Sequence, residues 1–157
     1  MRTTIRSVTL LALVTVAACS AKQSPSQATV SAAAPPIEAI ATTRQVMLGI
    51  TIPTSDVVFQ VGAKAPADDM EWEKVEANAL SLAESGTLLT IGSRAVDQQE
   101  WLKHCQDLIA TAKTAAAAAH EKNIDKVLDA GNAIYEVCDT CHKKYMAARQ
   151  GEDQQPQ

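Results

Sequence analysis

Apolar residues recur every three to four positions along most of this chain, which is the period of an α-helix. Four such stretches can be separated by turn signals, among them Gly92-Ser93. Pro53 interrupts the first stretch, so we expect that helix to be kinked or restarted there. An alternating pattern typical of a half-buried strand does not occur at useful length.

Each stretch has one apolar face, which we expect to be buried. The first face contains Ile37, Ile40, Ala41, Arg44, Met47, Leu48, Thr51, Val57, Val58 and Val61. The second contains Trp72, Val75, Ala79, Leu82 and Ala83. The third contains Trp101, Cys105, Leu108, Ala112, Ala115 and Ala119. The fourth contains Ile124, Val127, Leu128, Gly131, Ile134, Tyr135, Cys138, Cys141, His142 and Tyr145. Four helices with short connections predict an all-α fold, an antiparallel four-helix bundle over residues 37–148.

Composition agrees with helices, because alanine is abundant and only 3% of the residues are aromatic. The formal net charge of −4 argues against nucleic acid as a partner. Residues 19–36 are rich in Ser, Gln, Ala and Pro, which predicts a flexible tether in front of the bundle. Residues 149–157 are polar and are expected to form a tail.

Residues 1–18 have the pattern of an export signal. Arg2 and Arg6 precede an apolar run over residues 8–18 that is too short to span a bilayer as a mature helix. The run ends in Val-Ala-Ala directly before Cys19, which resembles the lipobox of bacterial lipoproteins and implies lipidation of Cys19. Ordinary signal cleavage nearby is the alternative. Lipidation would anchor the domain on the periplasmic side of a membrane, and Ser20 resembles the signal that sorts lipoproteins to the outer membrane.

The fourth helix carries the candidate chemistry, Cys138-Asp139-Thr140-Cys141-His142. This is Cys-x-x-Cys-His, the attachment signature of c-type haem. On a helix Cys138 and Cys141 share one face, so their sulfurs can reach the two vinyl groups on one edge of a haem. His142 follows at once and can bind the iron from the same side. We therefore predict one covalent haem c, attached through Cys138 and Cys141, with His142 as the proximal iron ligand.

Three other interpretations of the motif compete with haem attachment. One is a chance match. A second is a dithiol redox centre of the thioredoxin type, which needs a strand before the motif and a helix that begins at it. A third is a structural zinc site, which needs a second ligand pair that the adjacent His104 and Cys105 do not supply. Export also favours haem, because a bare thiol pair outside the cytoplasm risks oxidation to a disulfide.

A helical domain with this motif near its C-terminus resembles the cytochrome c prime and cytochrome c556 group of haem proteins. The likeness covers roughly residues 37–147 and rests on the motif, the Lys-Lys-Tyr that follows it, and Arg-Gln-Val-Met-Leu at residues 44–48. It implies that the first helix faces the open side of the haem and that Arg44 lies near the haem propionates. On an apolar stripe the Arg44 side chain would need an anionic partner. At the edge of the stripe it could instead extend into water.

Met47 decides between two functions. A thioether is a good sixth iron ligand, although a Met on a stripe is more often core filler. Met146 follows His142 on the same helix and cannot reach the opposite face of the haem. The resemblance separates members that use Met and are six-coordinate from members whose sixth site is open and binds small gases. The stretch from residue 47 to 59 looks more like the first, so Met47 is expected to bind iron. Met146 stands where the second often has a basic residue, which weakens the match to the second.

The predicted function is therefore one-electron transfer with an unidentified redox partner protein, and the alternative is a gas-binding haem protein that takes NO or CO. Neither implies substrate chemistry, so the chain is not predicted to be an enzyme. Related bundles often form homodimers, and no stripe of this chain demands one. Cys105 is expected to be a small buried residue of the third helix.

Overall fold

The computed structural model describes residues 37–152, with side chains up to Met146. Every regular element in this range is a helix, which confirms the all-α prediction and is compatible with a helical bundle. The predicted signal segment 1–18, the lipidation site Cys19, the tether over 19–36 and the end of the predicted tail lie outside the described residues.

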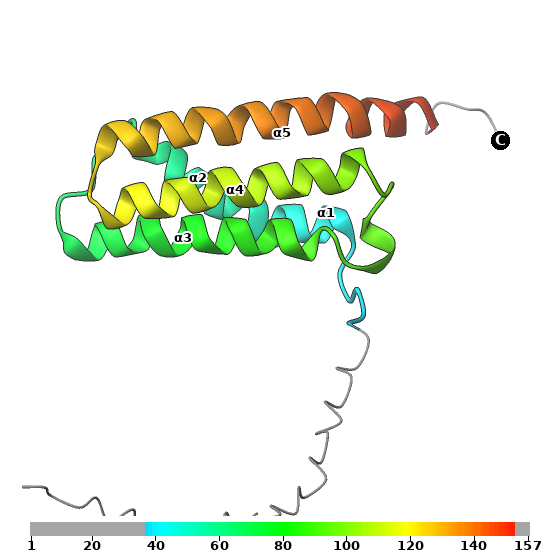
Figure 1. Ribbon diagram of the computed structural model, residues 1–157, viewed down its shortest axis with the longest axis horizontal. Helices are drawn as coiled ribbons and strands as arrows, with labels where there is room; N and C mark the ends of the chain where they lie inside the picture. The colour runs from blue at the N-terminus through cyan, green and yellow to red at the C-terminus, as the bar shows by residue number, and fades with distance from the viewer. Residues whose placement is uncertain (1–36, 153–157) are drawn as a thin grey trace, which may run out of the picture. The chain divides into compact units, whose positions relative to one another are not determined.

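Within residues 37–152 the chain forms one interrupted helix and three long ones (Figure 1). The first consists of α1 (Thr43–Val46), the π-helical turn η1 (Met47–Thr51) and α2 (Ile52–Gln60). It is followed by α3 (Asp69–Leu88), the short 3-10 helix η2 (Gly92–Arg94), α4 (Glu100–His120) and α5 (Ile124–Glu152). The most extensive packing is between α3 and α4, then between α4 and α5, while η1 and α2 pack on α3.

The first helix begins later than the hydrophobic pattern suggested. Thr42 caps it in a capping box, where its side chain accepts the N–H of Gln45 (3.2 Å) and its own N–H donates to Oε1 of Gln45 (2.9 Å). Ile37 and Ile40 precede this cap and are 76% and 95% exposed. The expectation that they face the core is therefore wrong, because the helix begins after the Thr42 cap and does not include their positions.

The predicted interruption at Pro53 takes the form of a π-helical turn directly before it. The N–H of Ile52 donates to the carbonyl of Met47, five residues back, and Pro53 then occupies the first turn of α2, where its missing N–H is tolerated. The chain stays helical through the turn. The hydroxyl of Thr54 donates to the carbonyl of Ile50 (2.7 Å), inside the irregular turn.

The π-helical turn also changes which residues of the first helix are buried. Val46 and Thr51 are both buried although they are five residues apart, a spacing that a π turn brings to one side and a regular α-helix does not. Arg44 and Leu48, which a regular helix would place on the inner stripe, are exposed instead. The predicted first face is correct at Thr51, Val58 and Val61 and wrong at Arg44 and Leu48.

The faces predicted for α3 and α4 are confirmed, since every residue assigned to them is buried. On α5, Val127 and Ile134 are fully buried, but Ile124, Leu128 and Tyr135 are exposed. This edge of α5 faces α2, and the two helices make few contacts with each other. The α5 helix also continues to Glu152, through the first residues of the segment predicted as a tail. No helix in the described range is both long and apolar enough to cross a bilayer.

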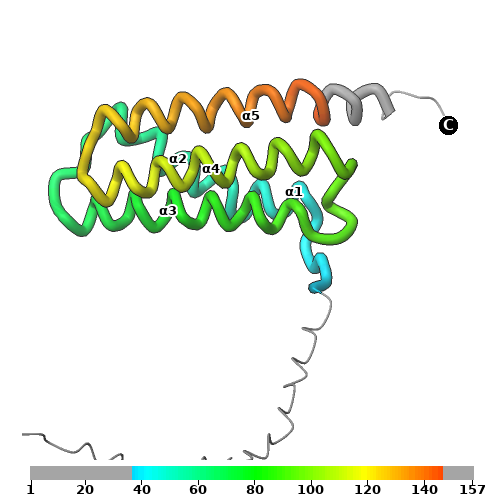
Figure 2. The backbone as a smooth tube through the Cα atoms, viewed as in Figure 1, coloured from blue at the N-terminus to red at the C-terminus, as the bar shows by residue number. Residues whose placement is uncertain are grey.

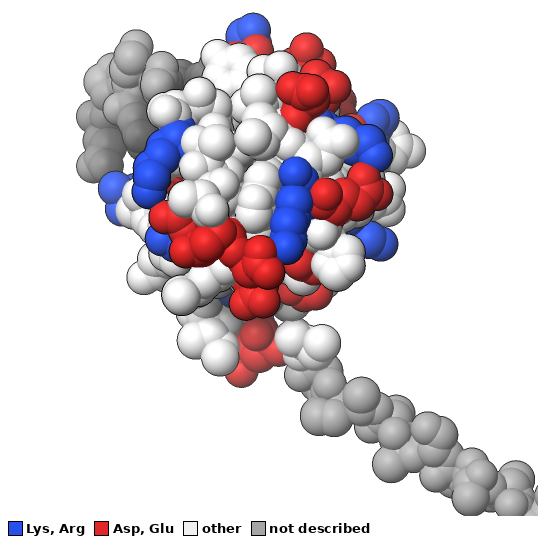
Figure 3. Space-filling view, turned by 90° about the vertical axis from the view of Figure 1, so that its left-hand side faces the viewer, with Lys and Arg blue, Asp and Glu red and all other residues white. Residues whose placement is uncertain are grey.

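A tight turn at residues 121–123 joins neighbouring ends of α4 and α5 (Figure 2). Lys122 adopts the left-handed conformation (φ 53°), and Asn123 then caps α5 by accepting the N–H of Lys126 (3.0 Å). Figure 3 views this end of the domain and shows lysines interspersed with acidic residues. Lys122 pairs there with Asp69 (2.8 Å) and Lys64 with Glu71 (3.0 Å), so this end has no field of a single sign.

The close approach of α3 and α4 depends on Gly86. A Cβ at this position would lie 2.7 Å from Cγ1 of Ile109 and 3.2 Å from the carbonyl oxygen of Cys105. At Gly49 in η1, by contrast, nothing lies within 4 Å of an added Cβ. The two glycines therefore separate the effect of packing from the effect of helix propensity.

We predict that Gly86→Ala lowers the free energy of unfolding by about 1–2 kcal/mol. Overpacking costs about 1–3 kcal/mol, and the higher helix propensity of Ala offsets only part of that cost. Gly49→Ala, the control, should raise it by about 0.5–1 kcal/mol. Urea unfolding followed by circular dichroism measures both. A Gly86→Ala protein as stable as the original would show that α3 and α4 are not this close.

Candidate functional site

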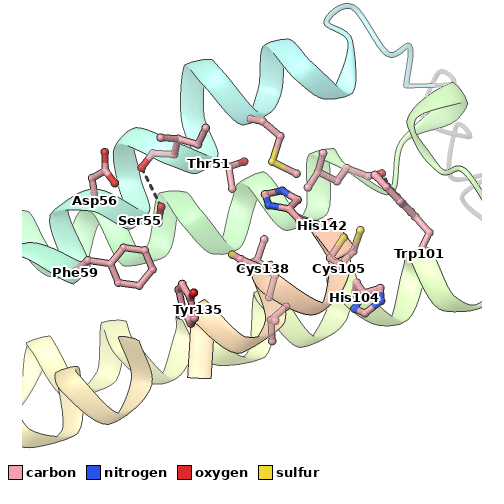
Figure 4. A pocket seen from close by; sticks show the side chains of 16 residues that line it. Thr51, Ser55, Asp56, Phe59, Trp101, His104, Cys105, Tyr135, Cys138 and His142 are labelled. Carbon is pink, nitrogen blue, oxygen red and sulfur yellow. Dashed lines mark hydrogen bonds between the residues drawn. The ribbon is translucent and has the colours of Figure 1, made fainter. Parts of the chain in front are cut away.

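A cavity of about 190 Å³ lies between α5, α4 and the wall formed by η1 and α2 (Figure 4). Its lining is largely apolar. The lining residues are Met47, Thr51, Ile52, Ser55, Asp56, Phe59, Leu89, Trp101, His104, Cys105, Leu108, Tyr135, Val137, Cys138, Cys141 and His142. The three residues of the predicted attachment motif are thus brought to one cavity, together with Met47.

The motif lies in the interior of α5, where Cys138 and Cys141 are half-buried and His142 is exposed. All three line the cavity because they follow each other within about one helical turn. The two thiols and the imidazole can therefore engage a single group bound between α5 and the opposite wall.

Both thiols of the motif are kept protonated. Burial raises the pKa of Cys138, and burial together with the neighbouring Cys138 raises the pKa of Cys141 to about 11. A catalytic dithiol of the thioredoxin type has a lowered pKa and begins a helix, and neither condition holds here. Among residues 37–146 no three His, Cys, Asp or Glu side chains are placed to hold a metal ion by themselves. The dithiol and zinc interpretations therefore lack their structural setting.

Met47 and Arg44 have different positions relative to the cavity. Met47 is half-buried, lines the cavity, and packs against a small core cluster that contains Leu89 and Trp101. This position is compatible with both an iron ligand and core filler. Arg44 is exposed and does not line the cavity. The side chain therefore reaches water in this conformation, as an Arg at the edge of a stripe does.

Two hydroxyl groups on the η1–α2 wall were not identified from the sequence. The hydroxyl of Thr51 donates to Oγ of Ser85 (3.1 Å), and Ser85 donates in turn to the carbonyl of Leu82 (2.7 Å). Ser55 donates to the carbonyl of Ile52 (2.9 Å). The hydroxyl groups of Thr51 and Ser55 thus both donate to acceptors within the protein. Thr51 on the predicted first face, with a Ser four residues later, was the available signal.

His104 was also missed, having been given no role. Its side chain is 11% exposed, and its Nε2 is buried without a hydrogen-bond partner among the described residues. The nearest carboxylate oxygen, Oε1 of Glu100, is 4.0 Å away. A buried polar atom left unpaired in a cavity wall costs free energy, so it marks a place where a bound group or water can supply a partner.

A hydrogen-bonded cluster fixes α5 just beyond the motif. Asp97 caps α4 by accepting the N–H groups of Gln99, Glu100 and Trp101, and its other oxygen accepts the hydroxyl of Tyr145 (2.5 Å). The Tyr145 ring meets Trp101 edge to face, with 5.0 Å between ring centroids. Tyr145 comes three residues after His142, so the cluster ties the motif's own helical turn to the start of α4.

No family model, curated protein or solved structure matches this chain.

The Asp97–Tyr145 hydrogen bond has a measurable consequence. The hydroxyl of Tyr145, followed by the N–H of Trp101, lowers the pKa of Asp97 from 3.8 to about 2. A carboxyl whose pKa is lower in the folded than in the unfolded protein stabilises the fold at pH values above its unfolded pKa. This contribution is lost as pH falls from about 4 through about 2.

We predict that Tyr145→Phe raises the pKa of Asp97 toward 3.8, so that acid unfolding begins at a higher pH. Titration of the Asp97 carboxyl by nuclear magnetic resonance gives the pKa directly. Tyr135→Phe, at an exposed position of the same helix, is the matched control and should leave that pKa unchanged. An Asp97 pKa that does not move in Tyr145→Phe would mean that the hydrogen bond does not form.

Proposed function

We propose that this chain is a c-type cytochrome with one haem attached covalently through Cys138 and Cys141, and that it serves as a one-electron carrier. The observation that carries the proposal is that both thiols and His142 line one largely apolar cavity. His142 would bind the iron. The haem would supply reversible cycling between Fe(III) and Fe(II), while the apolar surroundings would tune the potential by limiting water.

The residues around the cavity fit such a group. Thioether formation with vinyl groups would need Cys138 and Cys141 as free thiols, and both are free. The unpaired Nε2 of His104 leaves a polar partner free for a bound group. A haem would enter at the border between α2 and α5, because these helices make few contacts.

The surface along that border supports the same interpretation. Large side chains are left exposed on both sides of this border. They are Ile52 and Phe59 on α2 and Leu128 and Tyr135 on α5. Exposed apolar residues of this kind mark a surface that a ligand or partner covers. A flat apolar cofactor that entered between α2 and α5 would bury part of them.

The finer fold that we propose is the antiparallel four-helix bundle of the cytochrome c prime and c556 group. In it the segment from α1 to α2 would be the first helix, and α5, with its attachment motif, would be the last. Met47 lies on the wall that faces α5 and is our candidate for the sixth iron ligand. Arg44 would have to turn inward to reach a haem propionate.

The proposed location and partners follow from the N-terminal sequence and the charge. Lipidation at Cys19 would hold the domain on the periplasmic side of a membrane, with the outer membrane favoured, and residues 19–36 would serve as the tether. The redox partner would be another protein. Nucleic acid is not expected to bind, because the net charge is negative.

The optical spectrum of the matured, exported protein tests this function. We predict a low-spin reduced spectrum that carbon monoxide does not change, because Met47 would fill the sixth position. Met47→Ala should convert it into a high-spin spectrum that changes strongly with carbon monoxide. Met146→Ala, at an exposed position beyond His142, is the control and should behave like the original.

Other spectra would redirect the proposal. A high-spin, carbon monoxide-sensitive spectrum in the unaltered protein would favour the gas-binding function with an open sixth site. A low-spin spectrum that persists in Met47→Ala would remove Met47 as the ligand. A protein without any haem absorption would contradict both functions.

A further inference from the structure

Three thiols line the cavity, although haem attachment uses only two. Cys105 on α4 is 4% exposed and lines the same cavity as Cys138 and Cys141 on α5. Figure 4 shows Cys105 and Cys138 at its border. An unused thiol is unexpected in an exported protein, where thiols that can meet tend to be oxidised to disulfides.

The packing of α4 on α5 shows which of the two motif cysteines Cys105 faces. Trp101 on α4 contacts Tyr145 on α5, with 5.0 Å between the ring centroids. From this pair toward the 121–123 turn, one helical turn along α4 leads from Trp101 to Cys105, and one turn along α5 leads from Tyr145 to Cys141. The next turn brings Leu108 and Cys138 into the same core cluster. Cys105 is therefore level with Cys141, and Cys138 is level with Leu108.

The ionisation of the thiols agrees with this register. Burial, and then the proximity of Cys141, raises the pKa of Cys105 to about 11. Cys138 has no such effect on Cys105.

We propose that Cys105 and Cys141 form a disulfide in the chain before any group is attached at the motif. A small-molecule disulfide of the glutathione type would be the oxidant. Cys141 would attack it to give a mixed disulfide and release one small thiol, and Cys105 would then attack the Cys141 sulfur and release the second. The two cysteines lose two protons and two electrons in total, and the oxidant is reduced to two thiols.

The disulfide goes beyond the proposed function and does not depend on it, because it forms in the haem-free chain. The consequence of the disulfide for haem attachment does depend on the proposed function. A Cys141 sulfur held by Cys105 cannot make a thioether, so this bond would block attachment at one of the two positions until it is reduced. It would also link α4 to α5 and so hold the cavity wall together.

Two variants of the full-length haem-free chain, both with Cys19→Ser to remove the fourth thiol, test the pairing. Cys138→Ala leaves Cys105 and Cys141, and Cys141→Ala leaves Cys105 and Cys138. The loops that these pairs close differ by only three residues, so an unfolded chain should close them about equally well. Each is equilibrated with a glutathione redox buffer at mildly alkaline pH, alkylated under denaturing conditions and digested with trypsin.

In native buffer we expect the equilibrium constant for disulfide formation to be at least about tenfold larger in Cys138→Ala than in Cys141→Ala, because packing raises the effective concentration of the facing pair. In concentrated guanidinium chloride the two constants should agree within about twofold. Mass spectrometry detects the bond as a peptide of residues 104–113 joined to one of residues 127–143. Far-ultraviolet circular dichroism confirms that each variant is folded.

Equal constants for the two variants in native buffer would overturn the proposal. So would a chain with all three cavity thiols that forms only the bond between Cys138 and Cys141. Either result would leave the proposed cytochrome function untouched, because the assay contains no haem. In the same way, failure of haem attachment would not affect a positive disulfide result.

Discussion

The packing of α5 against α4 is the constraint on which the site depends. Small alanines on α4, with Val127 and Ile134 on α5, form a close and fully buried contact that sets the rotation of α5 about its own axis. Once this rotation is set, Cys138 and Cys141 have to face the cavity. The Tyr145 cluster then fixes the far end of the same helix, so the motif is held between two anchored segments.

The opposite wall depends on an irregularity in the first helix. Val46 and Thr51 are both buried across the π turn before Pro53 and Met47 lines the cavity, whereas Arg44 and Leu48 of the predicted stripe are exposed. Single π turns are frequent at functional sites, because the extra residue changes which side chains share a face. Few contacts join this wall to α5.

Most of the fold could be predicted from the sequence, because α3 and α4 are regular amphipathic helices whose whole apolar faces are buried. The motif could also be placed on a long helix, since its stripe contains Val127 and Ile134. The start of the first helix could not be predicted, because a capping box at Thr42 outweighs the apolar Ile37 and Ile40. The π turn shifts the register by one residue, and no periodicity rule anticipates that shift.

The candidate site was predictable where the residues are adjacent in the sequence and, with the help of the family resemblance, at Met47. Cys138, Cys141 and His142 lie together in one turn, so their shared face follows from helical geometry alone. His104, Cys105 and the Thr51–Ser85 hydrogen bond reach the cavity through packing between helices that are distant in the sequence. The unpaired Nε2 of His104 is a property of that packing, which explains why its sequence position carried no signal.

The most direct test is tandem mass spectrometry of the tryptic peptide of residues 127–143 from the protein purified after export and maturation. If the proposal is correct, this peptide carries one haem, bonded to the sulfurs of both Cys138 and Cys141. A peptide that is recovered from such protein only with free or disulfide-bonded cysteines, and with no haem, would contradict the assignment of this site.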